Sequence, residues 1–295
     1  MGPGLSSCPT GRGFAAGAGR ASGLASLGGQ AHPRPASPRR AAPTERSTQV
    51  TQQETAARPA RPGTGVTADG RRRAEVVSYA QRGASLDARQ AAAWESHAHE
   101  WWIPDEEADQ DGFDVQQWFD SPAPLIVEIG CGVGDTTAAL ATARPSYNIL
   151  GFEVWRPGIA ETFRRLEQSG AGNVRMMSID AAWAIEHLLG PATVSELWTF
   201  FPDPWPKKRH HRRRLVNPSF ASVAASRLAP GGTWRLATDW LPYADQMADV
   251  LSAEPLLQSM CDGPAPRWAE RPLTRFERRG IAADRPITDL AFRRL

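Results

Sequence analysis

From residue 125 onward, short runs of apolar residues alternate with longer segments in which apolar residues recur every three or four positions. The apolar runs predict strands at residues 125–130, 147–154, 174–180, 194–201 and 233–239. The longer segments predict helices near residues 133–143, 158–168, 181–189, 218–228 and 242–252. Strands that alternate with helices of this length are typical of a parallel, doubly wound α/β sheet. Two further strands are predicted near residues 256–261 and 287–292.

The first 73 residues lack this pattern. They are rich in Ala, Gly, Pro, Arg, Ser and Thr, and they contain few large apolar side chains. Such a segment buries too little apolar surface to offset the conformational entropy lost on ordering, so we predict a disordered extension over residues 1–73. One folded domain is predicted over residues 74–295, with a lead-in at residues 74–120 and an α/β core at residues 121–295.

Charge is distributed unevenly along the chain. Residues 1–74 carry 11 Arg, no Lys and 3 acidic residues, whereas residues 75–295 carry 23 basic and 29 acidic residues. Six of those 23 basic residues lie in one run, KKRHHRRR, from Lys207 to Arg214. The predicted domain is therefore acidic except at one basic segment, which is a candidate surface for a polyanion. A solvated charged face is the alternative interpretation.

The first predicted strand ends in a glycine-rich turn, EIGCGVGD, from Glu128 to Asp135. Gly130, Gly132 and Gly134 allow the backbone to turn sharply and to approach a ligand closely. A GxGxxG dinucleotide fingerprint requires glycine at position 135, where this chain has aspartate. Carboxylates beside the glycines favour a cationic ligand such as S-adenosylmethionine, which carries a sulfonium and an ammonium group. A plain tight turn is the alternative.

The next two predicted strands also end in acidic residues, Glu153 and Asp180. The carboxyl ends of parallel strands share one edge of the sheet, where an acid after the second strand holds ribose hydroxyls. Asp180 precedes small residues and is a candidate acceptor for an adenine amine, although it also fits a helix N-cap. Three acidic strand ends together favour a nucleoside cofactor, with S-adenosylmethionine preferred to NAD.

The fourth predicted strand leads into FPDPW, residues 201–205, and then into the basic run. Ligands in this fold class bind outside the carboxyl ends of the strands, so Asp203 is expected to face the reactive end of the cofactor. Trp205 is a candidate for stacking on a base. Lys207 and its basic neighbours are placed to hold RNA phosphates near that carboxylate. A proline-rich turn with a packed tryptophan is the alternative.

Two later segments complete the predicted substrate side. ATDW ends the fifth predicted strand and presents Asp239 at the same edge of the sheet. TRFE supplies Thr274, Arg275, Phe276 and Glu277. Thr274 and Glu277 are candidates for hydrogen bonds to a base edge, and Phe276 is a second candidate for stacking. An ordinary charged helical turn is the alternative.

Residues 74–295 resemble the bacterial tRNA (guanine-N7)-methyltransferases in five motifs, which follow in the order VEIGCGVGD, GFEVWRPG, FPDPWPKKRHHRRRLV, LATDW and TRFERRG. The resemblance implies a class I methyltransferase with a Rossmann-like, mostly parallel sheet whose last strand is antiparallel. It also implies S-adenosylmethionine as the cofactor and N7 of a tRNA guanine as the acceptor, at position 46 in the variable loop. Such an enzyme is expected in the cytoplasm.

The same resemblance assigns roles to individual residues. The cofactor-contacting acids of the family match Glu128, Glu153, Asp180 and Asp203. Asp203 also matches the active-site position. Positions of substrate contact match Lys207, Asp239 and the four residues from Thr274 to Glu277. Arg275 stands where lysine is frequent, and the long N-terminal extension has no counterpart in the core of the family.

Two other functions stay open at this point: a class I methyltransferase with a different acceptor, and a non-catalytic RNA-binding partner subunit with the same fold. The presence of Asp203, Glu128 and all three glycines favours catalysis.

Cysteine usage and hydropathy bear on metals, membranes and location. The three cysteines are widely spaced and form no CxxC pair, so no metal site is predicted and a reducing compartment fits. No apolar run approaches the roughly 18–20 residues that a membrane-spanning helix needs. The sequence leaves both a monomer and a homodimer possible.

Overall fold

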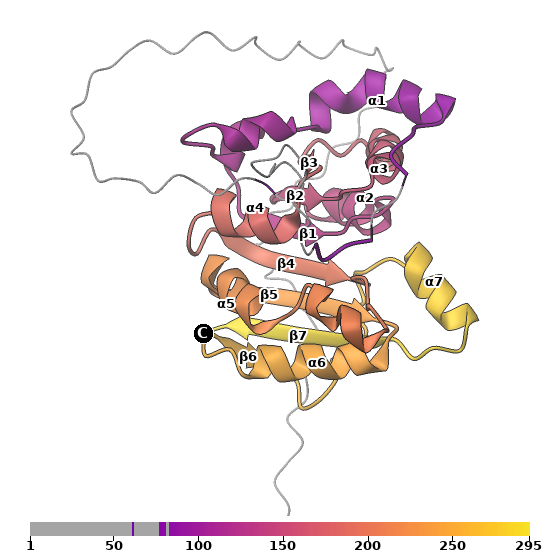
Figure 1. Ribbon diagram of the computed structural model, residues 1–295. Helices are drawn as coiled ribbons and strands as arrows, with labels where there is room; N and C mark the ends of the chain where they lie inside the picture. The colour runs from indigo at the N-terminus through magenta and orange to yellow at the C-terminus, as the bar shows by residue number, and fades with distance from the viewer. Residues whose placement is uncertain (1–60, 62–76, 81–82) are drawn as a thin grey trace, which may run out of the picture. The chain divides into compact units, whose positions relative to one another are not determined.

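The computed structural model describes residue 61, residues 77–80 and residues 83–295 (Figure 1). The predicted disordered extension, residues 1–73, lies outside the described residues apart from Arg61, which pairs with Asp109. No helix of the described residues is long and apolar enough to cross a membrane.

Seven strands form one mixed sheet in the order β3-β2-β1-β4-β5-β7-β6. The strands are β1 (Leu125–Ile129), β2 (Asn148–Phe152), β3 (Val174–Met177), β4 (Val194–Phe200), β5 (Leu228–Thr238), β6 (Leu257–Ser259) and β7 (Thr288–Arg294). The first five strands are parallel, and β7 runs antiparallel to both β5 and β6. The predicted doubly wound sheet with an antiparallel last strand is therefore confirmed.

Helices cover both faces of this sheet (Figure 1). The α-helices are α1 (Ala88–Trp101), α2 (Asp135–Ala143), α3 (Arg156–Ser169), α4 (Ala181–Leu188), α5 (Pro218–Arg227), α6 (Leu241–Ser252) and α7 (Arg275–Ala282). Three short 3-10 helices are η1 (Asp105–Asp109), η2 (Val115–Trp118) and η3 (Lys208–Arg213). Helices α4, α5 and α6 pack on one face, and α2 and α3 pack on the other, with α1 lying against α3.

The central strand β1 shows why apolar runs become strands in this chain. Successive side chains of a strand point to opposite faces of the sheet, so Leu125 and Val127 join one core while Ile126 joins the other. All of these side chains are at most 1% exposed. A parallel strand covered by helices on both faces needs such a continuous apolar run.

Two features differ from the sequence prediction. Strand β5 begins at Leu228 rather than near residue 233, because Leu228 pairs with Val194 at the start of β4. Helix α1 was not predicted, although its start carries a capping box: the Asp87 carboxylate accepts from Gln90 N–H, and the Gln90 side-chain oxygen accepts from Asp87 N–H. Trp101 of this helix is buried against Phe163 of α3, so the lead-in packs directly on the core.

Candidate active site

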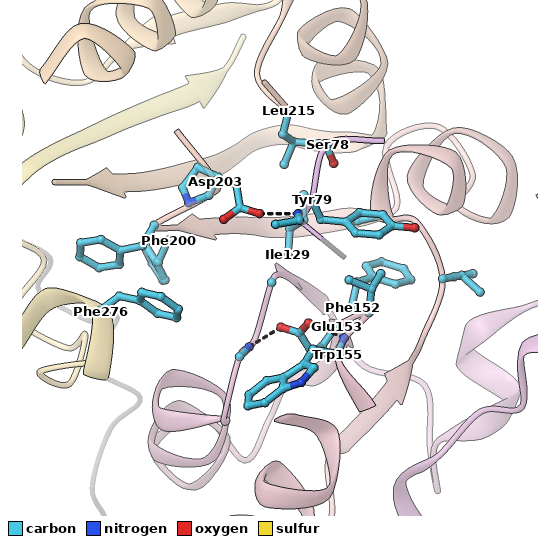
Figure 2. Close-up of a pocket in the computed structure, with 18 residues that line it drawn as sticks. Ser78, Tyr79, Ile129, Phe152, Glu153, Trp155, Phe200, Asp203, Leu215 and Phe276 are labelled. Atoms are coloured by element: carbon cyan, nitrogen blue, oxygen red, sulfur yellow. Dashed lines mark hydrogen bonds between the residues drawn. The ribbon is translucent and has the colours of Figure 1, made fainter. Parts of the chain in front are cut away.

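A pocket opens at the carboxyl ends of the central parallel strands (Figure 2). It encloses about 820 Å³, part of which is open to solvent. Its apolar walls include Ile129, Phe152, Ile179, Ala181 and Phe200. Its polar rim includes Glu153, Asp203 and the backbone of the glycine turn. The pocket therefore offers an apolar slot bounded by two carboxylates.

The glycine turn between β1 and α2 is held in place by Glu153. The Glu153 carboxylate accepts hydrogen bonds from the backbone N–H of Gly132 (2.7 Å) and of Trp155 (2.8 Å), as Figure 2 shows. Gly134 has φ +78°, and a Cβ there would lie 2.6 Å from the side chain of Thr162. Both its conformation and its close approach to α3 therefore require glycine.

Glu128, at the end of β1, lies beneath this turn and is only 3% exposed. Its carboxylate accepts a 2.6 Å hydrogen bond from the Thr137 hydroxyl. Burial raises the pKa of Glu128 to about 7, the Thr137 hydrogen bond opposes that shift, and the nearby charges of Glu153 and Asp135 add to it. Glu128 is therefore a buried acid near the pocket, and its side chain does not line the pocket.

Asp203 lies in the turn after β4, where the backbone is strained. Phe201 and Trp205 both have positive φ, at 55° and 45°, which bulky residues rarely adopt. Such strain persists only where surrounding contacts enforce it, and Phe201 N–H donates to Ala237 O at 2.7 Å. The turn holds Asp203 at the pocket, where its Oδ2 accepts a 2.7 Å hydrogen bond from Ala80 N–H (Figure 2).

The basic run divides into exposed and occupied side chains. Lys207, Lys208, Arg209 and Arg212 are exposed, the last three of them on η3. Arg214, in contrast, is 3% exposed and donates to Pro204 O, Pro242 O and the Gln246 side chain. The run is therefore not one uniform surface, because its last residue fastens the turn after β4 to α6.

Helix α7 lies beside the pocket and carries three of the predicted substrate residues. Thr274 caps this helix by accepting from Glu277 N–H, so the TRFE motif forms a helix start. Phe276 lines the pocket and lies 3.8 Å from a Cβ built on Gly132. Arg275 has an exposed side chain, and its backbone N–H donates to Asp135 Oδ2 at 2.9 Å.

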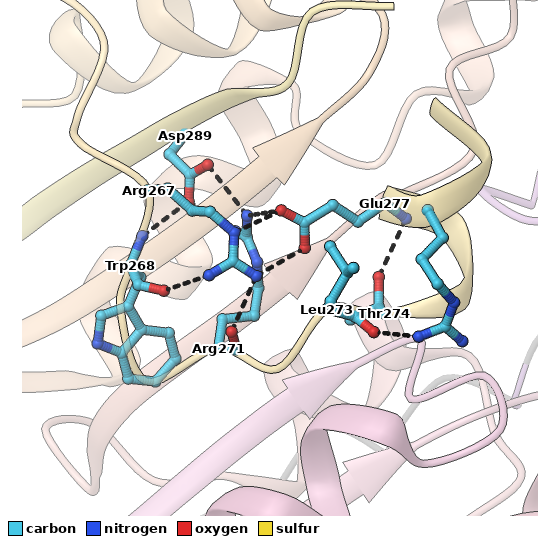
Figure 3. Close-up of polar contacts among 8 residues, drawn as sticks. Arg267, Trp268, Arg271, Leu273, Thr274, Glu277 and Asp289 are labelled. Atoms are coloured by element: carbon cyan, nitrogen blue, oxygen red, sulfur yellow. Dashed lines mark hydrogen bonds and ion pairs between the residues drawn. The ribbon is translucent and has the colours of Figure 1, made fainter. Parts of the chain in front are cut away.

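The Glu277 carboxylate faces away from solvent. The residue is 1% exposed, and its oxygens accept hydrogen bonds from Arg267 and Arg271 (Figure 3). Burial by itself would raise the pKa of Glu277, but the two guanidinium groups lower it below its usual value. Arg271 in turn binds both oxygens of Asp289 on β7. Glu277 is thus part of a buried ion-pair network that anchors α7 to the sheet.

Asp180 and Asp239 lie at strand ends, as predicted, and both already have protein partners. Asp180 caps α4 by accepting from Trp183 N–H at 3.0 Å, which is the N-cap alternative raised by the sequence. Its neighbours Ile179 and Ala181 line the pocket. Asp239 follows β5 and accepts a 2.8 Å hydrogen bond from Arg285 Nε. Within the described residues, no cluster of His, Cys, Asp or Glu is suited to hold a metal ion.

Comparison with known proteins decides the family. The family model Methyltransf_4, described as "Putative methyltransferase", matches residues 122–290. A tRNA (guanine-N(7)-)-methyltransferase of Nocardioides sp. (strain JS614) is 56% identical over 237 residues, covering 80% of this chain and 94% of that protein. The chain belongs to the tRNA (guanine-N7)-methyltransferase family. Proteins of the same name from Cutibacterium acnes and Bordetella parapertussis are 55% identical over 185 residues and 39% identical over 260 residues. They cover 62% and 88% of this chain, and the chain covers 67% and 98% of them.

Membership of the tRNA (guanine-N7)-methyltransferases confirms the predicted resemblance, and with it a class I methyltransferase that uses S-adenosylmethionine. The pocket fits that cofactor. The apolar lining, which includes Phe152 and Ile179, suits an adenine ring, and Gly132 (φ +60°) adds no side chain to the pocket wall. Glu153 and Asp203 supply negative charge for a cationic ligand.

Sequence reasoning missed one part of this methyltransferase site. Ser78, Tyr79 and Ala80 line the pocket, and the Trp155 indole N–H donates to Gly83 O at 3.0 Å. These residues precede the first predicted strand by more than 40 positions, and no hydrophobic period marks them. The sequence carries no local signal that this segment would reach the turn that holds Asp203.

The raised pKa of Glu128 predicts a pH-dependent stability. The folded protein binds this proton more tightly than the unfolded chain, whose carboxyl titrates near 4.5, so stability decreases as pH rises from there through about 7. We expect Glu128→Gln to gain up to about 3 kcal/mol relative to wild type between about pH 5 and pH 8. Urea unfolding without cofactor at both pH values measures this difference. Parallel pH profiles for the two proteins would contradict the assignment.

Proposed function

We propose that this chain transfers the methyl group of S-adenosylmethionine to N7 of a guanine in tRNA, at position 46 of the variable loop. The observation that carries the proposal is the Asp203 carboxylate, held by a strained turn at the rim of a pocket with apolar walls. The family relationship and the basic side chains next to this turn support tRNA as the acceptor. Because tRNA is the proposed substrate, we also propose that the enzyme acts in the cytoplasm.

Asp203 acts by charge and position in this proposal. Guanine N7 has an in-plane lone pair and no proton, so the reaction needs no general base. The cofactor supplies a methyl group on a sulfonium; the S–C bond breaks as the N–C bond forms, and the purine becomes cationic. A fixed carboxylate beside the ring stabilises that developing charge, and alignment within the pocket supplies most of the remaining rate enhancement.

Nucleoside analysis of tRNA tests the reaction directly. Purified enzyme, tritiated methyl donor and unmodified tRNA are expected to yield labelled N7-methylguanosine, and a transcript with adenine at position 46 is expected to yield none. Label in another nucleoside would favour a class I methyltransferase with a different acceptor. Tight tRNA binding without affinity for S-adenosylmethionine in calorimetry would favour a non-catalytic partner subunit.

The exposed cations of the basic run are proposed to hold tRNA phosphates. We term residues 201–205, which hold Asp203, the catalytic turn. The loop that follows it carries the exposed side chains of Lys207, Lys208, Arg209 and Arg212. Side chains of this kind position a polyanion without reading its sequence. Their place next to Asp203 brings the RNA backbone to the pocket.

Removing two of these charges should weaken tRNA binding in a salt-dependent way. We expect a Lys208→Ala and Arg209→Ala double variant to raise the KM for tRNA and to reduce the slope of log Kd against log salt by about 1.5 to 2. Fluorescence titrations across a range of KCl concentrations measure that slope. Arg293→Ala is the matched control, because Arg293 is exposed near the end of β7, where it pairs with Thr233 and lies away from Thr238 at the carboxyl end of β5. An unchanged slope in the double variant would remove these side chains from the RNA surface.

A further inference from the structure

The guanidinium of Arg213 faces protein rather than solvent. It stacks on the Trp205 ring at 3.7 Å from the ring centroid. Its Nε donates to Val77 O at 3.1 Å, and its terminal nitrogen donates to Tyr79 O at 3.2 Å. Residues 77–80, here termed the N-terminal segment, are therefore bound by Arg213, the seventh residue of the basic run Lys207–Arg214, which the sequence analysis made a candidate RNA surface.

Trp205 completes this attachment from the catalytic turn. Its indole N–H donates to Ser78 O at 2.9 Å, so three successive carbonyls of the N-terminal segment are bound by Arg213 and Trp205. The positive φ of Trp205 directs the ring into this position. A bulky residue holds such a conformation only when its contacts offset the strain, and the stacked guanidinium is one of those contacts.

The attachment has a consequence at Asp203. The N-terminal segment presents Ala80 N–H to Asp203 Oδ2 at 2.7 Å, and among the described residues Oδ1 accepts no hydrogen bond. A backbone N–H on one oxygen fixes the orientation of the carboxylate and leaves the other oxygen for a substrate. Ser78, Tyr79 and Ala80 also form part of the pocket wall. The segment thus completes the site rather than filling it.

We propose that Arg213 is a positioning residue, which fixes the N-terminal segment against the catalytic turn so that Ala80 orients Asp203 and the pocket for the methyl donor is closed on that side. The proposal rests on the proposed function insofar as Asp203 serves the transfer. It separates Arg213 from its exposed neighbour Arg212, although the two are adjacent in one basic run. The planar fork of arginine is essential to this role, because it donates to two carbonyls while stacking on an aromatic ring, which an ammonium group does not reproduce.

The test compares Arg213→Ala, Arg213→Lys and Arg212→Ala in the full-length protein. For Arg213→Ala we expect about tenfold weaker S-adenosylmethionine binding by calorimetry without tRNA. We expect a 10- to 100-fold lower single-turnover rate at saturating tRNA, roughly the cost of a misplaced catalytic group. The salt slope of tRNA binding should stay at its wild-type value. Arg212→Ala should show the opposite pattern, with a smaller salt slope and wild-type affinity for the methyl donor.

Arg213→Lys distinguishes the two roles most sharply. Lysine keeps the positive charge that phosphate binding needs, but it cannot donate to two carbonyls while stacking on Trp205. We therefore expect Arg213→Lys to behave like Arg213→Ala. Trp205→Phe, which keeps the ring but loses the donor to Ser78 O, should weaken methyl-donor binding in the same direction and serves if an Arg213 variant does not fold. Hydrogen exchange at Ala80 should accelerate in every variant that weakens cofactor binding.

Two results would overturn the proposal. One is full recovery of rate and cofactor affinity in Arg213→Lys, and the other is a reduced salt slope with wild-type cofactor affinity in Arg213→Ala. The cofactor affinity in each result does not depend on which nucleoside is methylated, because it is measured without tRNA. If the proposed function fails instead, the nucleoside analysis of the wild-type protein yields no labelled N7-methylguanosine, although that protein still binds S-adenosylmethionine.

Discussion

Asp203→Asn should lower the single-turnover rate of methyl transfer by about 10²- to 10³-fold, with little change in the KM for tRNA. The amide keeps the size of the side chain, and its carbonyl oxygen still accepts the hydrogen bond from Ala80 N–H. What it loses is the negative charge beside the purine. The loss therefore falls on the transition state, in which the ring becomes cationic, and rapid-quench assays at saturating tRNA measure it.

Asp245→Asn is the matched control for this charge removal. Asp245 is an exposed acid on α6 and does not line the pocket, so its substitution should leave the rate within twofold of wild type. A near-wild-type rate in Asp203→Asn would show that alignment alone accounts for the transfer. A rate lost in Asp203→Asn together with weak tRNA binding would assign Asp203 to ground-state binding of the base.

The alternation of strands and helices along the chain, and the edge of the sheet at which the pocket opens, could be predicted from the sequence because both follow from local patterns and from the fold class. Apolar runs such as LIVEI are long enough to form strands buried on both faces, and their acidic ends necessarily meet at one edge. The start of α7 also had a local signal, since Thr274 followed by Glu277 is a capping-box spacing. The same residues also fit contacts to a base edge, so the sequence alone leaves both the helical turn and the substrate-binding role open.

The parts that could not be predicted depend on contacts between distant positions. Ala80 meets Asp203 across 123 residues, and Arg271 meets Asp289 only after β7 has inserted beside β5. Charge runs are equally ambiguous, because Arg212 and Arg214 have the same sequence surroundings but opposite burial. Whether a cation faces RNA or protein is decided by tertiary packing, which the sequence pattern does not contain.

The ion-pair network of Arg267, Arg271, Glu277 and Asp289 should dominate the stability with which α7 is attached to the sheet (Figure 3). Arg271 is fully buried, binds Asp289 and Glu277, and lies 5.1 Å from the centroid of the Phe200 ring at the pocket wall. Removing one member of a buried ion-pair network leaves uncompensated charge in an apolar environment. We therefore expect Arg271→Met to destabilise the fold by about 3–5 kcal/mol in urea unfolding.

Arg267→Met provides the comparison, because Arg267 pairs with the same Glu277 carboxylate but its side chain is 40% exposed. Solvent screens this ion pair, so we expect the substitution to lower the free energy of unfolding by about 1 kcal/mol or less.

Glu277→Gln then separates the network from a direct substrate role. If Glu277 anchors α7, this variant should lose stability in the absence of tRNA, and Asp289→Asn combined with Arg271→Met should recover part of the loss from Arg271→Met alone. If Glu277 instead holds a base edge, Glu277→Gln should unfold like wild type and raise only the KM for tRNA. Because its oxygens already accept hydrogen bonds from two guanidinium groups, we expect the first result.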